Sequence, residues 1–119
     1  MKVKSGVANP ARGEIWDVDL NPTVGREQSG HRPALIVSDD AMNASQRGLV
    51  VVIPVTGTDR GLPSHVPVNP PDGGLSKFSV IMTEQIRSVS KVRLGRRHGK
   101  VTQEIMDQVE QTLRLVLGL

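Results

Sequence analysis

The sequence predicts a mainly β fold: a small, strongly curved antiparallel β barrel that carries one amphipathic helix at its C-terminal end. Two observations favour this class. Residues 14–89 contain short runs of β-branched and apolar residues, separated by turns rich in Gly, Pro, Asn and Asp. Residues 102–117 change to the spacing of a helix with one apolar face.

The first strand is predicted to begin at Glu14, where apolar residues start to alternate with acids, and its Trp16 is expected in the core. Residues 1–11 lack periodicity and predict a loose N-terminal arm, so residues 12–119 are expected to form one domain. Residues 21–30, NPTVGREQSG, combine two Gly and one Pro with charged side chains. They predict a long exposed loop.

Two further strands are predicted in the first half of the chain. One starts just after Pro33, and Asp39 or Asp40 can cap the short helical turn that follows it. The run LVVVIPVT, residues 49–56, is almost entirely β-branched and apolar, which predicts the central core strand. Its Pro54 indicates a bulge or a sheet edge near the end of that strand.

Three short strands are predicted in the second half, over residues 64–68, 78–83 and 85–89, the first of them at a sheet edge. Residues 93–99 predict an irregular or weakly extended segment. Thr102 is a suitable N-cap for the final helix. The apolar side chains of that helix follow helical spacing, at Ile105, Val109, Leu113, Val116 and Leu117.

Composition excludes several classes of function. The 119 residues include no Cys, which rules out a disulfide scaffold, thiolate metal sites and a Cys nucleophile. One Trp, one Phe and no Tyr leave little material for a surface that stacks many bases. No apolar run approaches the roughly 20 residues of a membrane span, and no signal-peptide pattern is present. A cytoplasmic protein without membrane contact is expected.

Basic residues are concentrated near the C-terminal end. The net charge is +3, and residues 87–100 hold six Lys or Arg residues together with His98 and no acid. Such a strip is the electrostatic pattern expected for binding a phosphate backbone. A solvated basic loop would give the same pattern, so charge alone leaves both interpretations open.

Sequence motifs for metals or nucleotides are absent. His31, His65 and His98 lie far apart in the sequence, without the spacing of a metal-binding motif. No Gly-rich loop followed by Lys is present to hold phosphates. The sequence therefore predicts neither a metal nor a cofactor.

Three segments, taken in order, resemble the MazF/PemK toxins. They are residues 12–33, with RGEIW, DLNPTVGREQSG and RP; residues 53–56, IPVT; and residues 83–89, TEQIRSV. Each motif is weak alone, but their order and spacing extend over most of the chain. RPALIVSDDAMN at residues 32–43 and LRLVLGL at residues 113–119 add to the likeness.

The resemblance implies an SH3-like barrel of the CcdB/Kid type and the activity of an mRNA interferase, an endoribonuclease that cuts single-stranded RNA at short sequences. It also implies a homodimer and a cognate antitoxin that neutralises the toxin, with DNA contacted only through the antitoxin. The loop of residues 22–30 would be the segment that moves over the RNA.

Specific residues follow from the resemblance. The catalytic pair of the family falls on Arg32 and Thr56. The positions that contact RNA fall on Glu27, Gln28, His65, Ser79, Glu84, Gln85 and Arg87. Without the resemblance, simpler roles are favoured: a structural ion pair for Arg32 with Asp39 or Asp40, a hydroxyl bound to its own backbone for Thr56, and turn residues for Glu84 and Gln85.

The chemistry of these residues is consistent with RNA cleavage. The 2′-hydroxyl of RNA can attack the adjacent phosphorus and expel the 5′-oxygen, which leaves a 2′,3′-cyclic phosphate. The enzyme must then hold the backbone in line and stabilise charge on the phosphoryl oxygens, to which Arg32 offers two parallel donors and Thr56 one more. A guanidinium is a poor proton carrier at neutral pH. Candidates for a separate carrier are His31, His65, Glu27 and Glu84.

Other functions remain possible on the same fold. His31 departs from the small or variable residue usual before the RP motif of the family, and either an exposed loop His or an added proton relay would explain it. The barrel also serves toxins that bind DNA gyrase, and a non-catalytic nucleic-acid-binding module is a third possibility. An RNA digest distinguishes these alternatives.

Overall fold

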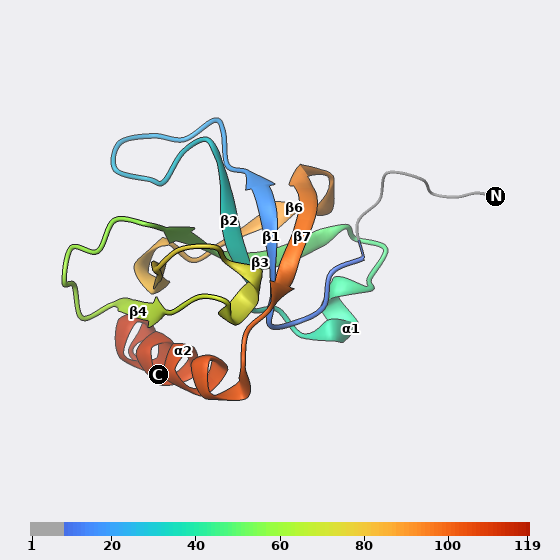
Figure 1. Cartoon of the computed structure of the whole chain (residues 1–119). Helices are drawn as coiled ribbons and strands as arrows, with labels where there is room; N and C mark the ends of the chain where they lie inside the picture. The colour runs from blue at the N-terminus through green and yellow to red at the C-terminus, as the bar shows by residue number, and fades with distance from the viewer. Residues whose placement is uncertain (1–8) are drawn as a thin grey trace.

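The computed structural model describes residues 9–119, so most of the predicted N-terminal arm, residues 1–8, lies outside the described part. Seven strands form one antiparallel sheet with the order β4-β5-β3-β2-β1-β7, and β6 pairs with β3 beside this path (Figure 1). The strands are β1 Glu14–Asp19, β2 His31–Ile36, β3 Leu49–Thr56, β4 His65–Val68, β5 Ser79–Met82, β6 Arg87–Ser90 and β7 Leu94–Lys100. Within residues 9–119, no ladder joins β4 to β7, so hydrogen bonding does not close the predicted barrel.

Two α-helices and three short 3₁₀ turns complete the fold. They are α1 Asp40–Asn43, α2 Gln103–Leu117, η1 Asp72–Gly74, η2 Thr83–Gln85 and η3 Lys91–Arg93. Both predicted caps are confirmed: the Asp39 side chain accepts from the Ala41 N–H, and the Thr102 side chain accepts from the Ile105 N–H. Gly118 ends α2 in the left-handed conformation.

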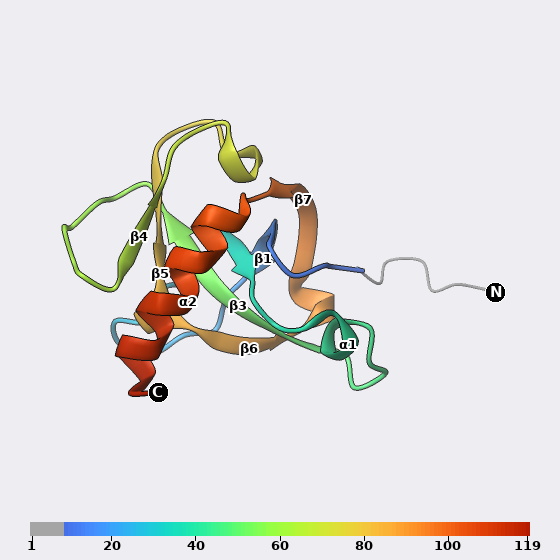
Figure 2. The ribbon, with the colours of Figure 1, turned by 90° about the horizontal axis from the view of Figure 1, so that it is seen from below.

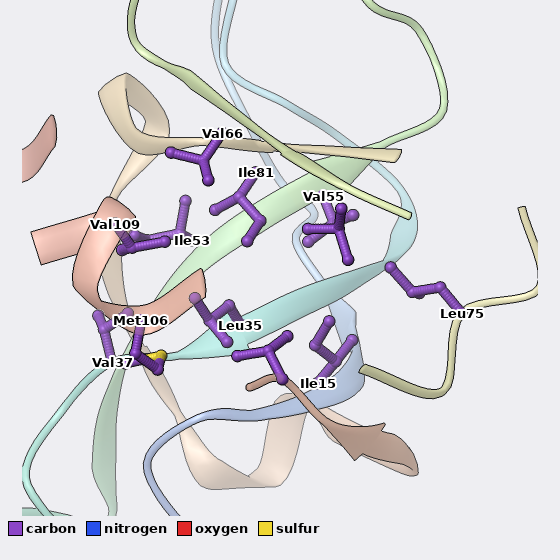
Figure 3. Close-up of a cluster of buried hydrophobic side chains, with 12 residues drawn as sticks. Ile15, Leu35, Val37, Ile53, Val55, Val66, Leu75, Ile81, Met106 and Val109 are labelled. Atoms are coloured by element: carbon purple, nitrogen blue, oxygen red, sulfur yellow. The ribbon is translucent and has the colours of Figure 1, made fainter. Parts of the chain in front are cut away.

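Helix α2 packs across the sheet and covers one of two hydrophobic clusters (Figure 2). Met106 and Val109 of α2 meet Leu35 of β2 and Ile53 of β3 in this cluster (Figure 3). The second cluster draws its side chains from β1, β2, β3, β6 and β7 and from Leu20. Alternate residues of β2 and β3 therefore face different clusters, and the two central strands are buried on both faces.

Strand β3 has the bounds that the sequence predicts, but Pro54 occupies neither an edge nor a bulge. On one side β3 pairs with β2 through Pro54. On the other side it pairs with β6 up to Val52 and with β5 from Val55. Pro54 thus lies where the neighbouring strand changes and no ladder hydrogen bond is required of it.

One sequence prediction about strand bounds is wrong, and another is only partly confirmed. Strand β2 starts at His31, before Pro33, because the ladder with β1 reaches His31 whereas the ladder with β3 begins only at Ala34. The segment predicted as irregular or weakly extended is strand β7, which pairs with β1 along an outer edge of the sheet, although two register shifts interrupt that ladder. Its Arg, Gly and His residues have low strand propensity, so pairing with β1 determines its conformation.

Trp16, expected in the core, is only partly buried. It packs against the edge of the second cluster, and its indole N–H donates to Glu14 at 3.0 Å. A polar contact of this kind is usual for a partly buried indole.

The turn η1 lies directly against β7. A Cβ atom on Gly74 would lie 2.0 Å from the carbonyl oxygen of His98, and one on Gly99 would lie 2.8 Å from the backbone of Gly73. Only glycine allows the two backbones to approach this closely. The contact fixes the position of His98 relative to η1.

Replacing Gly74 by Ala is therefore expected to lower the free energy of unfolding by on the order of 3 kcal/mol, because backbone atoms must move apart. Gly48→Ala is the matched control: its φ of +73° is close to the +74° of Gly74, but no atom lies within 4 Å of the added Cβ. The control bears only the cost of left-handed backbone, about 1 kcal/mol. Urea unfolding measures the free energy of unfolding of both variants. Equal losses for Gly74→Ala and Gly48→Ala would contradict the close approach of η1 to β7.

Candidate active site

The register between β2 and β3 places Arg32 beside Thr56. Ala34 pairs with Pro54, and continuing this antiparallel register by two residues sets Arg32 opposite Thr56, just beyond the end of the ladder. Both residues line one surface pocket of about 620 Å³. The pair that family resemblance assigns to catalysis is thus brought together by strand pairing.

The pocket is basic. Its charged and titratable lining side chains are His31, Arg32, Lys77, Arg96 and His98, and no Asp or Glu is found among its described lining residues. Hydroxyl groups of Thr56, Ser76 and Ser79 also line it. Such a surface attracts a phosphate backbone and offers it several hydrogen-bond donors.

Arg32 is half-buried and held by neutral groups. Its Nε–H donates to the carbonyl oxygen of Ser29 at 2.9 Å. With the Gln28 amide turned so that its oxygen faces the guanidinium, that oxygen accepts from Nη2 of Arg32 at 3.1 Å. The simpler role considered for Arg32, an ion pair with Asp39 or Asp40, is wrong: Asp39 caps α1, and Asp40 accepts from the backbone of residue 12. The guanidinium charge has no carboxylate partner within residues 9–119.

Thr56 combines a structural contact with a free donor. Its Oγ1 accepts from the backbone N–H of Thr58 at 3.2 Å, which is the simpler role considered for it from the sequence. A hydroxyl that accepts one hydrogen bond still has its own hydrogen to donate. The contact therefore orients the hydroxyl and leaves its hydrogen for a ligand in the pocket.

Ser79 shares this pocket, whereas most other predicted RNA contacts line a second, smaller one. Ser79 is buried and donates to the carbonyl oxygen of Lys77 at 3.1 Å. The second pocket measures about 150 Å³, and its lining includes Glu27, Gln28, Glu84, Gln85 and Arg87. The structure thus separates the predicted residues into two groups, with Gln28 lying between them because its side chain also reaches Arg32.

The loop of residues 21–30 is attached to η2 through Gln85. The Gln85 side chain accepts from the backbone N–H of Gln28 at 3.2 Å and donates to the carbonyl oxygen of Arg26 at 3.3 Å. Arg87 lies nearby and donates to the carbonyl oxygen of Leu20 at 3.2 Å. Gln85 is thus a turn residue that also contacts the loop.

His65 lies outside both pockets. Its side chain is 4% exposed, and its Nε2 lies 3.0 Å from Oε2 of Glu84. The other carboxylate oxygen of Glu84 accepts from the Ser64 hydroxyl at 2.8 Å. Burial alone would raise the pKa of Glu84, but the hydrogen bonds from Ser64 and His65 outweigh it and hold the pKa below its usual value.

His98 was not among the residues singled out from the sequence, although it belongs to the basic strip. It lines the large pocket, and its Nε2 lies 2.5 Å from Oδ1 of Asp17. Only the pairing of β1 with β7 brings these two residues together, so no sequence spacing could indicate the contact.

Within residues 9–119, no three His, Asp or Glu side chains gather in a way that could hold a metal ion. None of the described helices is long and apolar enough to cross a membrane.

The lowered pKa of Glu84 predicts a dependence of stability on pH. An ionised Glu84 stabilises the folded state above pH 4.5, and this contribution is lost as the pH falls through the lower pKa of the folded state. Glu84→Gln should therefore lose less stability than the wild-type protein on acidification below pH 4.5. Denaturant unfolding at several pH values measures the effect, with Glu104→Gln as a control for the loss of one acid. If the free energy of unfolding depends on pH in the same way for Glu84→Gln and the wild-type protein, ionised Glu84 does not make this contribution.

Comparison with known proteins identifies the family of the chain. Residues 11–117 match a family described as PemK-like, MazF-like toxin of type II toxin-antitoxin system. Endoribonuclease EndoA of Bacillus subtilis is 37% identical over 109 residues, 91% of this chain and 94% of the relative. Endoribonuclease MazF9 of Mycobacterium tuberculosis is 39% identical over 113 residues, 91% of this chain and 96% of the relative.

Solved structures show the same fold. MazF from Deinococcus radiodurans superimposes with a TM-score of 0.84 at 27% identity, over 94% of this chain and 99% of that one. An endoribonuclease in complex with its cognate antitoxin, from a mycobacterial species, superimposes with a TM-score of 0.77 at 32% identity, over 92% and 96% of the two chains. The chain belongs to the PemK/MazF family of type II toxin-antitoxin toxins, whose relatives named here are endoribonucleases.

Proposed function

We propose that this toxin cuts single-stranded RNA in the large basic pocket, with Arg32 and Thr56 at the scissile phosphate. The observation that carries the proposal is the placement of two groups at the end of one strand ladder: the Arg32 guanidinium, which has no carboxylate partner among residues 9–119, and the oriented Thr56 hydroxyl. A gyrase-binding toxin and a non-catalytic module are not favoured, because the named relatives are endoribonucleases.

In the proposed reaction the RNA supplies the nucleophile. The 2′-hydroxyl attacks the adjacent phosphorus, and the 5′-oxygen leaves, which gives a 2′,3′-cyclic phosphate and a 5′-hydroxyl. Charge increases on the phosphoryl oxygens during the attack. Arg32 and Thr56 stabilise that charge with donors that are held in place before the substrate arrives.

The second pocket extends the proposed RNA path. Glu27, Gln28, Glu84 and Gln85 can pair with base edges, and Arg87 can pair with a phosphate. His65 would act through Glu84, since its ring is buried against that carboxylate. These contacts would set the sequence that is cut.

We propose that a cognate antitoxin inhibits this chain, as the structures of related toxins with their antitoxins suggest. An acidic, partly disordered antitoxin segment would compete with RNA for the basic pocket. Family resemblance further supports a homodimer that acts in the cytoplasm and reaches DNA only through the antitoxin.

Arg32→Ala is expected to lower the rate of RNA cleavage by about 10² or more, since it removes the main stabiliser of the developing charge. Arg60→Ala is the matched control: it removes the same charge from an exposed loop that does not line the pocket. Single-turnover cleavage of a long defined RNA, with products mapped by primer extension, measures both rates. Wild-type cleavage by Arg32→Ala would contradict the proposed mechanism.

Because the nucleophile belongs to the substrate, cleavage should continue in EDTA. Replacing the 2′-hydroxyl at the cut site by hydrogen should abolish it, while the same change one nucleotide away should not. Gel analysis of the unmodified RNA and of the two singly 2′-deoxy RNAs, with and without EDTA, measures cleavage in each case. Loss of activity in EDTA would indicate a metal-dependent reaction instead.

A further inference from the structure

The proposed reaction needs a group that accepts the proton of the 2′-hydroxyl, and neither Arg32 nor Thr56 suits that task near neutral pH. We infer that His98 accepts this proton and that Asp17 is its positioning residue. The inference rests on the proposed cleavage of RNA in the large pocket.

A β-bulge places His98 at the pocket. Ile15 pairs with Gly99 and Trp16 pairs with Arg97, so His98 is the extra residue between two consecutive pairs of the ladder. Bulges of this kind redirect a side chain, and they are common beside active sites. The result here is that His98 lines the pocket together with Arg32 and Thr56.

Two contacts hold the His98 residue in place. Its ring is hydrogen-bonded to Asp17 of β1, with Nε2 2.5 Å from Oδ1. Its backbone carbonyl lies against Gly74 of η1, where even a Cβ atom would not fit. The side chain is 14% exposed. His98 is thus held on two sides, and its side chain lines the pocket.

The contact with Asp17 determines which ring nitrogen of His98 carries the lone pair. The carboxylate accepts a hydrogen bond from Nε2–H, so the lone pair of the neutral ring is on Nδ1. Nη2 of Arg96 lies 3.5 Å from Nδ1, at the long limit for a hydrogen bond, so the 2′-hydroxyl must displace this donor to reach Nδ1. Other charged or titratable groups at the pocket are Arg32, Lys77 and His31, and Asp17 also lies 3.8 Å from Nε of Arg96.

The other two histidines are less suited to this role. The His31 side chain is 77% exposed, and its nearest carboxylate, that of Asp19, is 3.9 Å away. His65 is buried against Glu84, outside the pocket. His98 is therefore the one described histidine that both lines the pocket and is held by a short hydrogen bond.

The step balances without a further reactant. Nδ1 of His98 takes the 2′-hydroxyl proton as the 2′-oxygen forms its bond to phosphorus, and the bond from phosphorus to the 5′-oxygen breaks. The leaving oxygen takes a proton from water, and the imidazolium returns its proton to solvent. The enzyme ends as it began, and the products are the cyclic phosphate and the 5′-hydroxyl.

His98→Gln tests the inference, because the Gln amide can still donate to Asp17 in place of Nε2 but has no counterpart of the basic Nδ1. Single-turnover cleavage is measured from about pH 5 to about pH 9. We expect the cleavage rate of this variant to fall about 10²-fold at neutral pH. The acidic limb of the profile, which is the decrease in rate toward low pH, should be lost. Asp17→Asn should lower the rate by about tenfold while an acidic limb remains. Binding of a 2′-deoxy RNA analogue and thermal unfolding should change little.

A second substrate shows whether His98 acts as a base or as an acid. With sulfur in place of the leaving 5′-oxygen, departure needs no proton, so the defect of His98→Gln should persist. Disappearance of the defect would overturn the assignment as a base. So would an unchanged pH profile in His98→Gln, or loss of the acidic limb in His31→Gln instead. If the wild-type protein itself cuts no RNA, the proposed function fails as well.

One measurement needs no variant. ¹⁵N NMR of the wild-type histidine rings should show His98 with its hydrogen on Nε2 when neutral. A hydrogen on Nδ1 would leave no lone pair facing the substrate and would overturn the inference.

Discussion

Pairing between β2 and β3 determines where Arg32 and Thr56 lie. Leu35 and Ile53 form one pair of this ladder, and both side chains are fully buried in the cluster beneath α2. Because both faces of β2 and β3 are buried, a shift of one strand by one residue would exchange side chains between the two clusters, for example Leu35 for the smaller Ala34, and such overpacking costs about 1–3 kcal/mol. The buried apolar residues therefore fix the register, and the register brings the polar pair together two residues beyond the ladder.

The rest of the pocket is built by chain segments that approach from the other edge of the sheet. Strand β7 joins through β1, and its bulge places His98 at the pocket that the first residues of β2 also line. The glycines of η1 let that turn approach β7 closely enough to complete the wall. Buried backbone contacts thus set the positions of Arg32, Thr56 and His98 in this basic surface.

Sequence patterns predicted those elements whose signal is local. The alternating and β-branched runs gave β1 and β3, and helical spacing after Thr102 gave α2. Arg32 and Thr56 could be proposed only from family resemblance, since each residue alone has simpler roles. Strand β7 and the role of His98 could not be predicted, because Arg, Gly and His carry little strand propensity and a bulge depends on the partner strand.

A crystal structure with an uncleavable RNA, carrying a 2′-deoxy nucleotide at the cut site, tests the central claim most directly. The account predicts the scissile phosphate in the large pocket, with its oxygens within hydrogen-bond distance of the Arg32 guanidinium and the Thr56 hydroxyl. A scissile phosphate held elsewhere, with Arg32 and Thr56 facing away from it, would contradict the account.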